Sequence, residues 1–513
     1  MIRRIFLVGM MGAGKSTVGR RVAEALGWDF LDTDAMVAEA VGMSIPEIFS
    51  RKGEAFFREA EKEAVARAGE KENVVVATGG GAVLASENWR AMESDGSLSV
   101  YLEASVNTLT RQVAGSGERP LLSGGPGKLA DILRARRAFY QRAGHTIRVD
   151  ERTPAQVAAR VIWLLEPDFS EADEGFFVGR GVSLSLLDIL RGHGHMKSFL
   201  VTDKRVWAAY GQDIAMQLKA LGPLSVHILP GGEESKTLAE AQSAWRRMKT
   251  LAADRETPVI ALGGGSVGDL AGFVASTYMR GLPLFQVPTT LLSMVDSSLG
   301  GKNALNLGRV KNLIGTFYFP KCVLADTVFV LGLDRDAFAD GMAEAIKTGL
   351  VASHELWDLV RENREALARR ELSSIGEMIS LAGRAKLSVV REDPHDRGKR
   401  HILNLGHTLG HTLELSLGLS HGHAVALGMV AEVKLASERG ITPPGPLEEL
   451  VEILSFYGLP TDLPEGFDPE KARHLLAHDK KTRGGKIILP AIKEPGVTEL
   501  IEVRPDDLVS ALA

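Results

Sequence analysis

The chain has 513 residues, of which 60 are lysine or arginine and 65 are aspartate or glutamate, so its formal net charge is −5. This near-neutral balance excludes a polycationic nucleic-acid binder. A content of 45% hydrophobic and 24% charged residues excludes a disordered chain. At roughly 100–200 residues per domain, the length predicts two or three domains.

A single cysteine, Cys322, excludes an intramolecular disulfide scaffold and predicts a cytoplasmic protein. The N-terminal apolar run stops at residues 12–15, GAGK, which is too early for a secretory signal and places a lysine where a cleavage site would need a small residue. Since no stretch reaches the roughly 18 apolar residues that a membrane span needs, we expect no membrane partner. The expected partners are small molecules, with no nucleic acid.

Apolar runs that end in glycine clusters alternate with amphipathic stretches, which is the pattern of a parallel α/β sheet. The runs predict strands at 5–8, 30–31, 74–76, 98–102, 147–149, 199–201, 226–229, 259–262, 285–287 and 486–489. The acidic segment 166–174 lacks helical periodicity and is predicted to be a linker between domains 1–165 and 175–333. Beyond it we expect a second, Rossmann-like α/β domain, and then a mainly α-helical domain at 334–513.

Residues 9–17, GMMGAGKST, match the phosphate-binding pattern G-x-x-x-x-G-K-[ST] between a strand and a helix. Glycines let backbone N–H groups converge on phosphate oxygens, Lys15 neutralises charge, and the Ser16 hydroxyl faces Mg²⁺. The pattern therefore predicts a nucleoside triphosphate bound with magnesium. Asp32 and Asp34 end the next strand, where they could serve magnesium and accept a proton, or equally could cap a helix.

The first 165 residues resemble shikimate kinase. The resemblance is carried by the glycine-rich loop and by FLDTD (30–34), FFRE (56–59), TGGG (78–81), RPLL (119–122) and Arg136. It implies ATP binding by Gly12, Ala13, Gly14, Lys15, Ser16, Thr17 and Arg119, a magnesium site at Ser16 and Asp32, and shikimate binding by Asp34, Arg58, Gly80 and Arg136. By the same resemblance Asp34 and Lys15 are catalytic, and the fold is a P-loop kinase domain with a parallel sheet.

In the second domain, residues 261–269 follow an apolar strand and open a predicted helix, so their amides could hold a pyrophosphate. A tight structural turn explains the glycines equally well. Between Arg280 and Asn312, charged residues stand in a loop-rich apolar run, which predicts a polyanionic ligand as their partner.

Five histidines crowd into residues 401–423 of the helical domain. His407 and His411, four apart, share a helix face, as do Glu344 and Lys347, three apart. Carboxylate and imidazole groups without cysteine predict a catalytic zinc site, although a polar patch between helices would use the same residues. Which two histidines bind a metal stays open at this level.

Residues from about 175 to 513 resemble 3-dehydroquinate synthase. The matching motifs are FVASTYMRG (273–281), VDSS (295–298), GMAEAIK (341–347), LNLGHTLGH (403–411) and DKK (479–481). The resemblance implies NAD and Zn²⁺ or another divalent metal as cofactors, and the conversion of 3-deoxy-D-arabino-heptulosonate 7-phosphate to 3-dehydroquinate with release of phosphate. It also implies a homodimer formed through this part of the chain.

The same resemblance assigns residue roles. Zinc ligands are Glu344, His407 and His421, and catalytic residues are His411, Lys347 and Asp396. NAD contacts are Asp203, Glu233, Lys236, Gly264, Gly265, Ser266, Asp269, Thr289, Thr290 and Lys311. Contacts to the phosphorylated substrate are Arg280, Asp296, Lys302, Asn312, Lys347, Lys386, Arg400, Asn404 and Lys480.

The chain departs from the family pattern at a few positions. His423 stands where glutamate is usual, so it could compete as a metal ligand or perturb the groups around the metal ligands, while Arg205 and Asp340 replace asparagines. The alternative to the bifunctional assignment is another small-molecule P-loop kinase joined to a metal-dependent polyol or alcohol dehydrogenase. A third class, a nucleotide-gated scaffold, predicts ATP binding without turnover.

Overall fold

The computed structural model describes residues 1–114, 125–308, 310–464, 467–477 and 486–510. The chain divides into two compact units, Met1–Glu166 with Arg369–Leu372, and Pro167–Ala368 with Ser373–Ala513. Among the described residues, no helix is both long enough and apolar enough to cross a membrane. The predicted α/β fold class is confirmed, and each unit has its own sheet.

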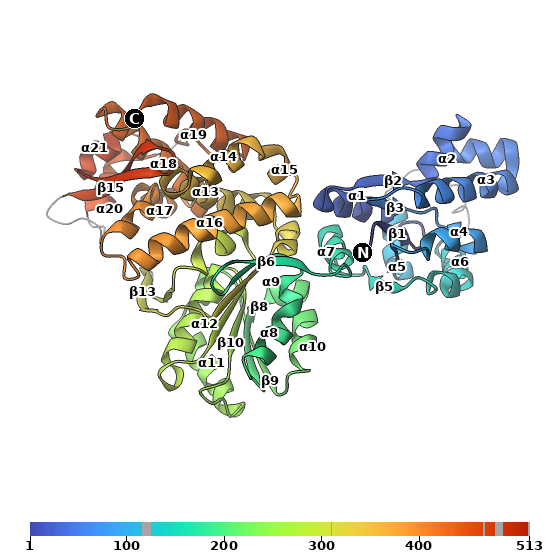
Figure 1. Cartoon of the computed structure of the whole chain (residues 1–513), viewed down its shortest axis with the longest axis horizontal. Helices are drawn as coiled ribbons and strands as arrows, with labels where there is room; N and C mark the ends of the chain where they lie inside the picture. The colour runs from blue at the N-terminus through green and yellow to red at the C-terminus, as the bar shows by residue number, and fades with distance from the viewer. Residues whose placement is uncertain (115–124, 309, 465–466, 478–485, 511–513) are drawn as a thin grey trace. The chain divides into compact units, whose positions relative to one another are not determined.

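The first unit is built on a parallel sheet with strand order β2-β3-β1-β4-β5 (Figure 1). Its strands are β1 (Arg4–Val8), β2 (Asp29–Asp32), β3 (Val74–Ala77), β4 (Ser97–Glu103) and β5 (His145–Arg148). Its helices are α1 (Lys15–Leu26), α2 (Thr33–Val41), α3 (Ile45–Gly69), α4 (Ser86–Met92), α5 (Val106–Ala114), α6 (Gly125–Tyr140) and α7 (Pro154–Ile162). Every residue of β3 is buried, which is why this central strand reads as an unbroken apolar run.

The second unit holds a sheet with strand order β6-β7-β14-β11-β10-β8-β9, in which all neighbours are parallel except β6 and β7. The strands are β6 (Asp168–Asp173), β7 (Phe176–Arg180), β8 (Ser198–Asp203), β9 (Leu224–Leu229), β10 (Val259–Gly263), β11 (Leu284–Pro288) and β14 (Cys322–Asp326). The next strand in the chain, β9, lies on one side of β8, and the strand after that, β10, lies on its other side. This reversal of strand order creates the crevice at which parallel α/β sheets bind ligands.

The predicted linker, residues 166–174, contains the boundary between the two units at Glu166 and Pro167, but most of it forms strand β6 of the second unit. Strand β6 pairs in antiparallel register with β7 at the sheet edge. Its residues Asp168–Glu171 are exposed, so acidic side chains remain in water while the backbone hydrogen bonds are made by the neighbouring strand.

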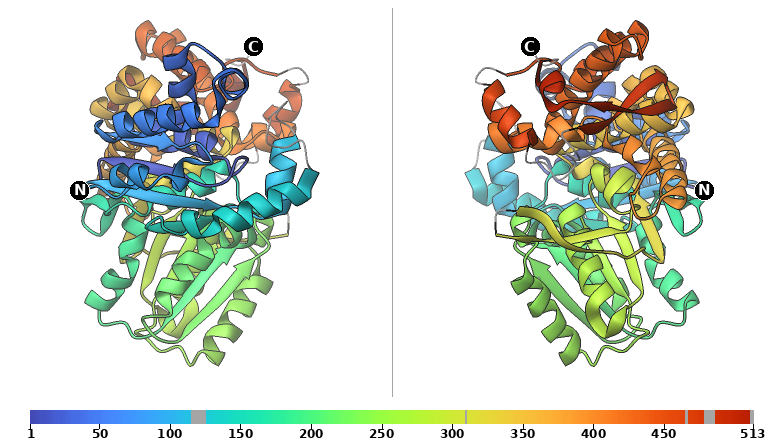
Figure 2. Two further views of the ribbon diagram at one scale, coloured as in Figure 1. Left: turned by 90° about the vertical axis from the view of Figure 1, so that its right-hand side faces the viewer. Right: turned by 90° about the vertical axis from the view of Figure 1, so that its left-hand side faces the viewer.

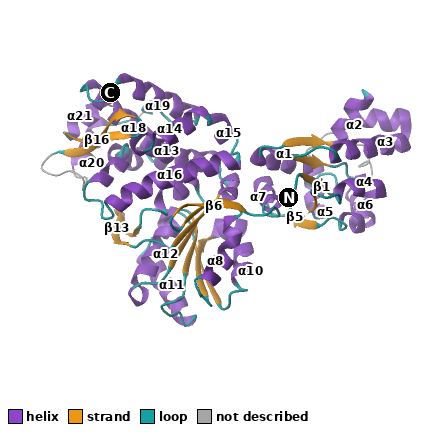
Figure 3. Ribbon diagram, in the orientation of Figure 1, coloured by secondary structure: helices purple, strands orange, loops and turns teal. Residues whose placement is uncertain are grey.

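Helices surround this sheet and continue into a helical region. Figure 3 shows the strands between α11 (Leu238–Thr250) and α12 (Gly265–Thr277) on one side and α8 (Leu186–Gly192) and α10 (Gln212–Leu218) on the other, and the short α9 spans Lys204–Val206. The helical region contains α13 (Arg335–Ala352), α14 (His354–Glu362), α15 (Arg364–Ala368), α16 (Leu372–Glu392), α17 (His407–Leu417), α18 (His421–Glu438), α19 (Pro444–Phe456), α20 (Pro469–Ala477) and α21 (Pro505–Ser510). In Figure 2 these orange and red helices gather at one end of the green strands.

Two antiparallel hairpins complete the second unit. The segment predicted to be loop-rich, between Arg280 and Asn312, contributes most of the hairpin β12 (Lys302–Leu307) and β13 (Val310–Phe317). The second hairpin, β15 (Ile487–Glu494) with β16 (Val497–Val503), packs on the helical core through Ile487, Leu489 and Val503. Burying each such side chain stabilises the fold by roughly 1.5–3 kcal/mol.

Candidate active sites

The loop after β1, which the sequence predicts to bind phosphate, leads into the start of α1. Gly14 has a φ of 84°, a left-handed conformation that suits glycine and lets the loop turn into the helix. The first turn of α1 carries no acidic side chain that would offset the helix dipole. Lys15 is buried, and its Nζ donates to the carbonyls of Gly9 at 2.9 Å and Met10 at 3.1 Å. The ammonium therefore lies over the loop, where phosphate oxygens would be held.

The magnesium ligands predicted for this unit lie together. The Ser16 hydroxyl donates to Asp32 Oδ2 at 2.6 Å, while Asp32 Oδ1 accepts from the backbone N–H groups of Asp34 and Ala35. Asp32 therefore caps α2 with one oxygen and leaves the other beside Ser16. A hydroxyl and a carboxylate oxygen at this distance fit a Mg²⁺ ion bound with a nucleotide.

The residues predicted to bind shikimate surround the turn Gly79–Gly81. A Cβ on Gly79 would lie 2.6 Å from Asp34 Oδ1, and one on Gly81 would lie 2.3 Å from Arg58 Nη1, so both side chains lie directly against this turn. Arg136 Nη1 donates to the Gly80 carbonyl at 3.1 Å. Asp34, Arg58, Gly80 and Arg136 are thus brought into one cluster of two guanidinium groups and one carboxylate.

Glu61 is a member of this cluster that sequence reasoning missed. Its Oε2 accepts from Arg58 Nη1 at 2.7 Å, and a Cβ on Gly79 would lie 2.4 Å from its Oε1. Burial raises the pKa of Glu61, although Arg58 opposes this effect. The available signal was its spacing, since it stands three residues after Arg58 on the same helix face.

The predicted dinucleotide residues of the second unit follow the strands at which the strand order reverses, β8 and β10. Asp203 ends β8, and its Oδ1 caps α9 by accepting from the N–H groups of Arg205 and Val206. Gly264 caps α12, whose first turn has no acidic side chain, and a Cβ on Gly264 would lie 3.1 Å from Thr290. A helix N-terminus at the reversal of strand order, closely approached by other loops, fits the pyrophosphate of NAD.

Lys236 connects several of the predicted NAD and substrate residues. Its Nζ lies 2.7 Å from Asp269 and 3.0 Å from Glu233, and it also donates to Asn312 Oδ1. Burial lowers the pKa of Lys236, but these carboxylates outweigh it and the net shift is upward. Burial raises the pKa of Asp269, against the effect of Lys236. The β12–β13 hairpin, which carries Asn312 and Lys311, is thereby fastened to the cofactor crevice.

A second cluster of cations is formed by residues predicted to hold the phosphorylated substrate. Lys386 pairs with Asp296, Lys302 Nζ lies 2.5 Å from Asp396 Oδ2, and Arg400 Nη2 donates to the Gly300 carbonyl at 2.9 Å. Burial lowers the pKa of Lys386 to about 8, against the opposing effect of Asp296. Two buried cations, Lys386 and Arg400, with the exposed Lys302 beside them suit a dianionic phosphate.

Some predicted residues are not brought into these clusters. Among the described residues, no hydrogen bond joins Arg280 or Asn404 to the cation cluster; Arg280 ends a turn after α12 with a φ of 70°. Asn404 ends the short 3₁₀ turn Lys399–Asn404 before α17. Two further predictions, Arg119 for ATP and Lys480 for the substrate, lie outside the described residues.

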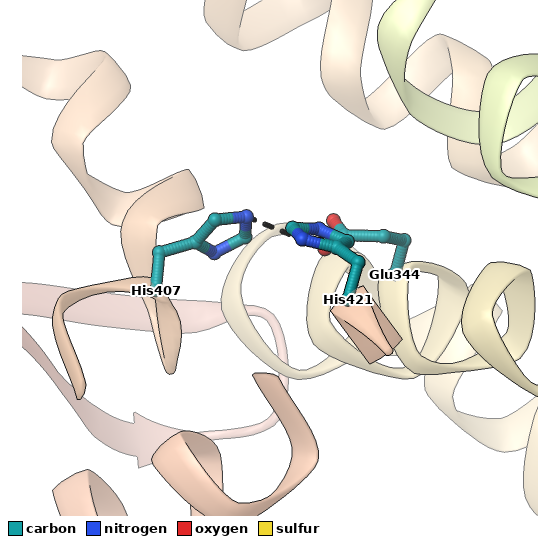
Figure 4. Close-up of side chains that lie close together, drawn as sticks. All are labelled: Glu344, His407 and His421. Atoms are coloured by element: carbon teal, nitrogen blue, oxygen red, sulfur yellow. Dashed lines mark hydrogen bonds and ion pairs between the residues drawn. The ribbon is translucent and has the colours of Figure 1, made fainter. Parts of the chain in front are cut away.

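Three helices place the predicted metal ligands together. One ligand atom each from Glu344 on α13, His407 at the start of α17 and His421 at the start of α18 lie within 4.8 Å of one another (Figure 4). The Nε2 atoms of His421 and His407 lie 3.2 Å and 3.4 Å from Glu344 Oε1. One carboxylate and two imidazoles converging on a point, without cysteine, fit a catalytic Zn²⁺ site that keeps an open position.

The electrostatics of this cluster also suit a cation. Burial raises the pKa of Glu344, but Lys347 and the two histidines outweigh it, so the net pKa lies well below its usual value. Burial lowers the pKa of His421, yet its hydrogen bonds to the carboxylates of Glu344 and Glu414 raise it overall to about 10. Glu344 therefore stays ionised, as a metal ligand must.

The other clustered histidines lie outside the ligand set. His423 Nδ1 is 2.7 Å from the Ser420 hydroxyl and 3.6 Å from Asp340, so the two departures at 340 and 423 meet each other. The group of possible ligands that lie within 4.8 Å of one another does not include His423, whose Nδ1 faces Ser420 and Asp340. The ring of His411 lies 5.7 Å from that of His407, on the same face of α17.

Comparisons with known proteins agree with this geometry. Family models described as shikimate kinase, 3-dehydroquinate synthase N-terminal and 3-dehydroquinate synthase C-terminal match residues 11–166, 226–340 and 341–482. A bifunctional shikimate kinase/3-dehydroquinate synthase of Thermotoga maritima is 37% identical over 99% of this chain and 100% of its own length.

Two solved structures resemble the second unit. A 2-deoxy-scyllo-inosose synthase complexed with carbaglucose-6-phosphate, NAD+ and Co2+ is 28% identical, with a TM-score of 0.59, over 67% of this chain and 99% of its own. A 2-epi-5-epi-valiolone synthase from Streptomyces hygroscopicus with NAD+ and Zn2+ bound is 25% identical, with a TM-score of 0.60, over 67% of this chain and 97% of its own. With the full-length match to the Thermotoga maritima protein, these findings show that the chain belongs to the bifunctional shikimate kinase/3-dehydroquinate synthase family.

Proposed function

We propose that the chain catalyses two reactions of the shikimate pathway. The first unit transfers the terminal phosphoryl group of ATP, bound with Mg²⁺, to shikimate. The second unit converts 3-deoxy-D-arabino-heptulosonate 7-phosphate to 3-dehydroquinate and releases phosphate, with NAD and a divalent metal as cofactors. The family match over 99% of the chain supports both activities.

In the kinase unit, each residue has a separate task. Lys15 and the backbone of its loop bind the triphosphate, and Ser16 with Asp32 holds its magnesium. Arg58 and Arg136 bind the carboxylate of shikimate, because a planar guanidinium group matches a carboxylate with two parallel hydrogen bonds. Asp34 lies against Gly79 in the same cluster, where it accepts the proton of the attacking hydroxyl.

In the synthase unit, Glu344, His407 and His421 hold the metal, and the crevice between β8 and β10 holds the dinucleotide. When bound, the metal polarises an alcohol oxygen and NAD accepts and returns a hydride. Lys386, Arg400 and Lys302 bind the phosphate, and Lys347 lies between the metal ligands and this cluster. His411, beside His407, exchanges a proton with the substrate.

The observation that carries the synthase assignment is the contact of Lys347 with Glu344 on one face of α13. Lys347 also interacts electrostatically with Asp296, the partner of Lys386. One buried lysine therefore adjoins both the residues proposed to hold the metal and those proposed to bind the phosphate. A synthase needs this arrangement, because the oxidised carbon and the departing phosphate belong to the same small substrate.

A chelation assay tests this function. The protein is treated with a chelator selective for transition-metal ions, and both activities are then measured with Mg²⁺ present. Phosphate release from the heptulosonate is expected to be lost and to return on adding Zn²⁺, while shikimate-dependent ADP release continues. Phosphate release that is indifferent to chelation would refute the synthase assignment, and ADP release independent of shikimate would refute the kinase assignment.

The proposal extends to a cytoplasmic homodimer formed through the synthase part. The single cysteine, Cys322, is buried in β14 and burial raises the pKa of its thiol to about 12, which suits a protein that uses no disulfide. Light scattering coupled to size-exclusion chromatography measures the assembly. The mass of two chains is expected, and the mass of one chain would refute the dimer.

A further inference from the structure

The two ring nitrogens of His421 have different partners. Nε2 lies 3.2 Å from Glu344 Oε1, on the side where the ligand atoms converge. Nδ1 lies 2.7 Å from Oε1 of Glu414, a residue on α17. A neutral imidazole that binds a metal through Nε2 must carry its proton on Nδ1. The carboxylate of Glu414 is the acceptor for that proton.

The side chain of Glu414 is itself held in place. It is 12% exposed, and its second oxygen, Oε2, lies 3.4 Å from Nζ of Lys311 on β13. Glu414 stands seven residues after His407 and thus lies on the same helix face, two turns further along α17. The carboxylate therefore has one partner on α18 and a second on the hairpin.

The other histidine ligand shows the same arrangement with a different acceptor. His407 Nδ1 lies 3.2 Å from the backbone carbonyl of Leu405, and its Nε2 points toward Glu344. In both imidazoles Nδ1 thus faces an acceptor outside the ligand cluster, while Nε2 faces Glu344 inside it. Only the acceptor for His421 belongs to a side chain, so only that one can be removed by substitution.

We propose that Glu414 is a positioning residue of the metal centre, which holds the proton of His421 on Nδ1 and its ring plane toward Glu344. This inference rests on the proposed function, because it takes His421 to be a metal ligand. Groups that orient metal-binding histidines in this way contribute about 10–100-fold to metal affinity.

The test is metal binding rather than turnover. Metal-free protein is titrated with Zn²⁺ against a chromophoric chelator, and the same variants are loaded with Co²⁺ for visible absorption spectra. Glu414→Ala is expected to raise the Kd for Zn²⁺ by about 10–100-fold and to change the Co²⁺ spectrum. Glu414→Gln keeps an oxygen that accepts from Nδ1 and is expected to recover most of the affinity. Glu438→Ala, at an exposed glutamate of α18, is the matched control and is expected to behave as wild type.

Two further variants keep the result decisive. His421→Ala must lose affinity if the proposed metal site is correct, so wild-type affinity in that variant would refute the site itself. If His421→Ala loses affinity while Glu414→Ala binds Zn²⁺ as tightly as wild type, the positioning role alone is overturned. Thermal unfolding of the metal-free proteins checks folding. Should Glu414→Ala not fold, Glu414→Asp, whose carboxylate is one methylene shorter, must show the loss instead.

Discussion

Lys386 on α16 pairs with Asp296, which lies in the turn Ser293–Ser297 after β11. Only 6% of the Lys386 side chain is exposed. The pair therefore joins the helical region to the loops at the end of the sheet, and it places a buried ammonium group where a phosphate is expected. Burial lowers the pKa of this ammonium to about 8.

This pKa predicts a pH limit for the synthase. The folded protein loses the Lys386 charge as the pH rises through about 8, whereas the unfolded chain keeps it until about 10.4. Between these values the unfolded chain binds more protons, so the unfavourable contribution of this group to stability diminishes as the pH rises. Substrate binding weakens over the same range, because the neutral amine attracts phosphate poorly.

We therefore expect kcat/KM for phosphate release to fall above pH 8, approaching about tenfold per pH unit. Lys386→Arg keeps its charge at high pH and is expected to shift this fall upward, even with a lower maximum. Lys399→Arg, at an exposed lysine paired with Glu392, is the control and should leave the profile unchanged. A wild-type profile that stays flat to pH 10 would contradict the role of Lys386.

Glu61→Ala is expected to raise the KM for shikimate by about tenfold or more, because Arg58 loses the buried acceptor that orients it. Glu54 also pairs with Arg58, but its side chain is 66% exposed. Since exposed pairs contribute little, Glu54→Ala should change the KM less than about twofold. Equal changes of the KM in the two variants, measured by steady-state kinetics, would contradict the claim that the buried Glu61 orients Arg58 more strongly than the exposed Glu54.

His423→Ala is expected to leave the Kd for Zn²⁺ within about threefold of wild type, because His423 lies outside the ligand cluster. The variant should lose about 0.5–1.5 kcal/mol of unfolding free energy through the hydrogen bond to Ser420. Metal titration and urea unfolding measure the two quantities. A loss of affinity as large as that of His421→Ala would make His423 a ligand.

Lys15→Met is expected to reduce shikimate-dependent ADP release by about 10²–10³-fold, since Lys15 supplies the charge above the phosphate loop. Phosphate release from the heptulosonate should remain within about twofold of wild type, because its residues belong to the other compact unit. Both rates are measured on one preparation. A parallel loss of the two activities would show that the units do not work independently.

The parts of the fold that sequence predicts are those with a local signal. Strands such as β3 and β10 are buried along their whole length and read as unbroken apolar runs. Strand β6 has acidic side chains in water, and every residue of β13 except Thr316 is exposed. Neither strand has the buried residues whose apolar pattern predicts a strand from sequence. Each is a strand because a neighbouring strand pairs with its backbone.

The same distinction holds within the sites. The resemblance named Glu344, His407 and His421, and the structure brings them together. It did not point to Glu61 or Glu414, which act through another side chain. The role proposed for Glu414 can be recognised only from the contact with His421 on α18. No spacing in the sequence encodes this tertiary contact.

The most direct measurement concerns the balance of NAD in the second unit. Metal-loaded protein is mixed with the heptulosonate phosphate and with NAD at a small fraction of the substrate concentration, and phosphate and absorbance at 340 nm are followed together. We predict that the released phosphate exceeds the NAD many times over while no NADH accumulates, because the hydride returns to the carbon it left. Accumulation of NADH, or release that stops when the NAD is consumed, would contradict the account and indicate a dehydrogenase.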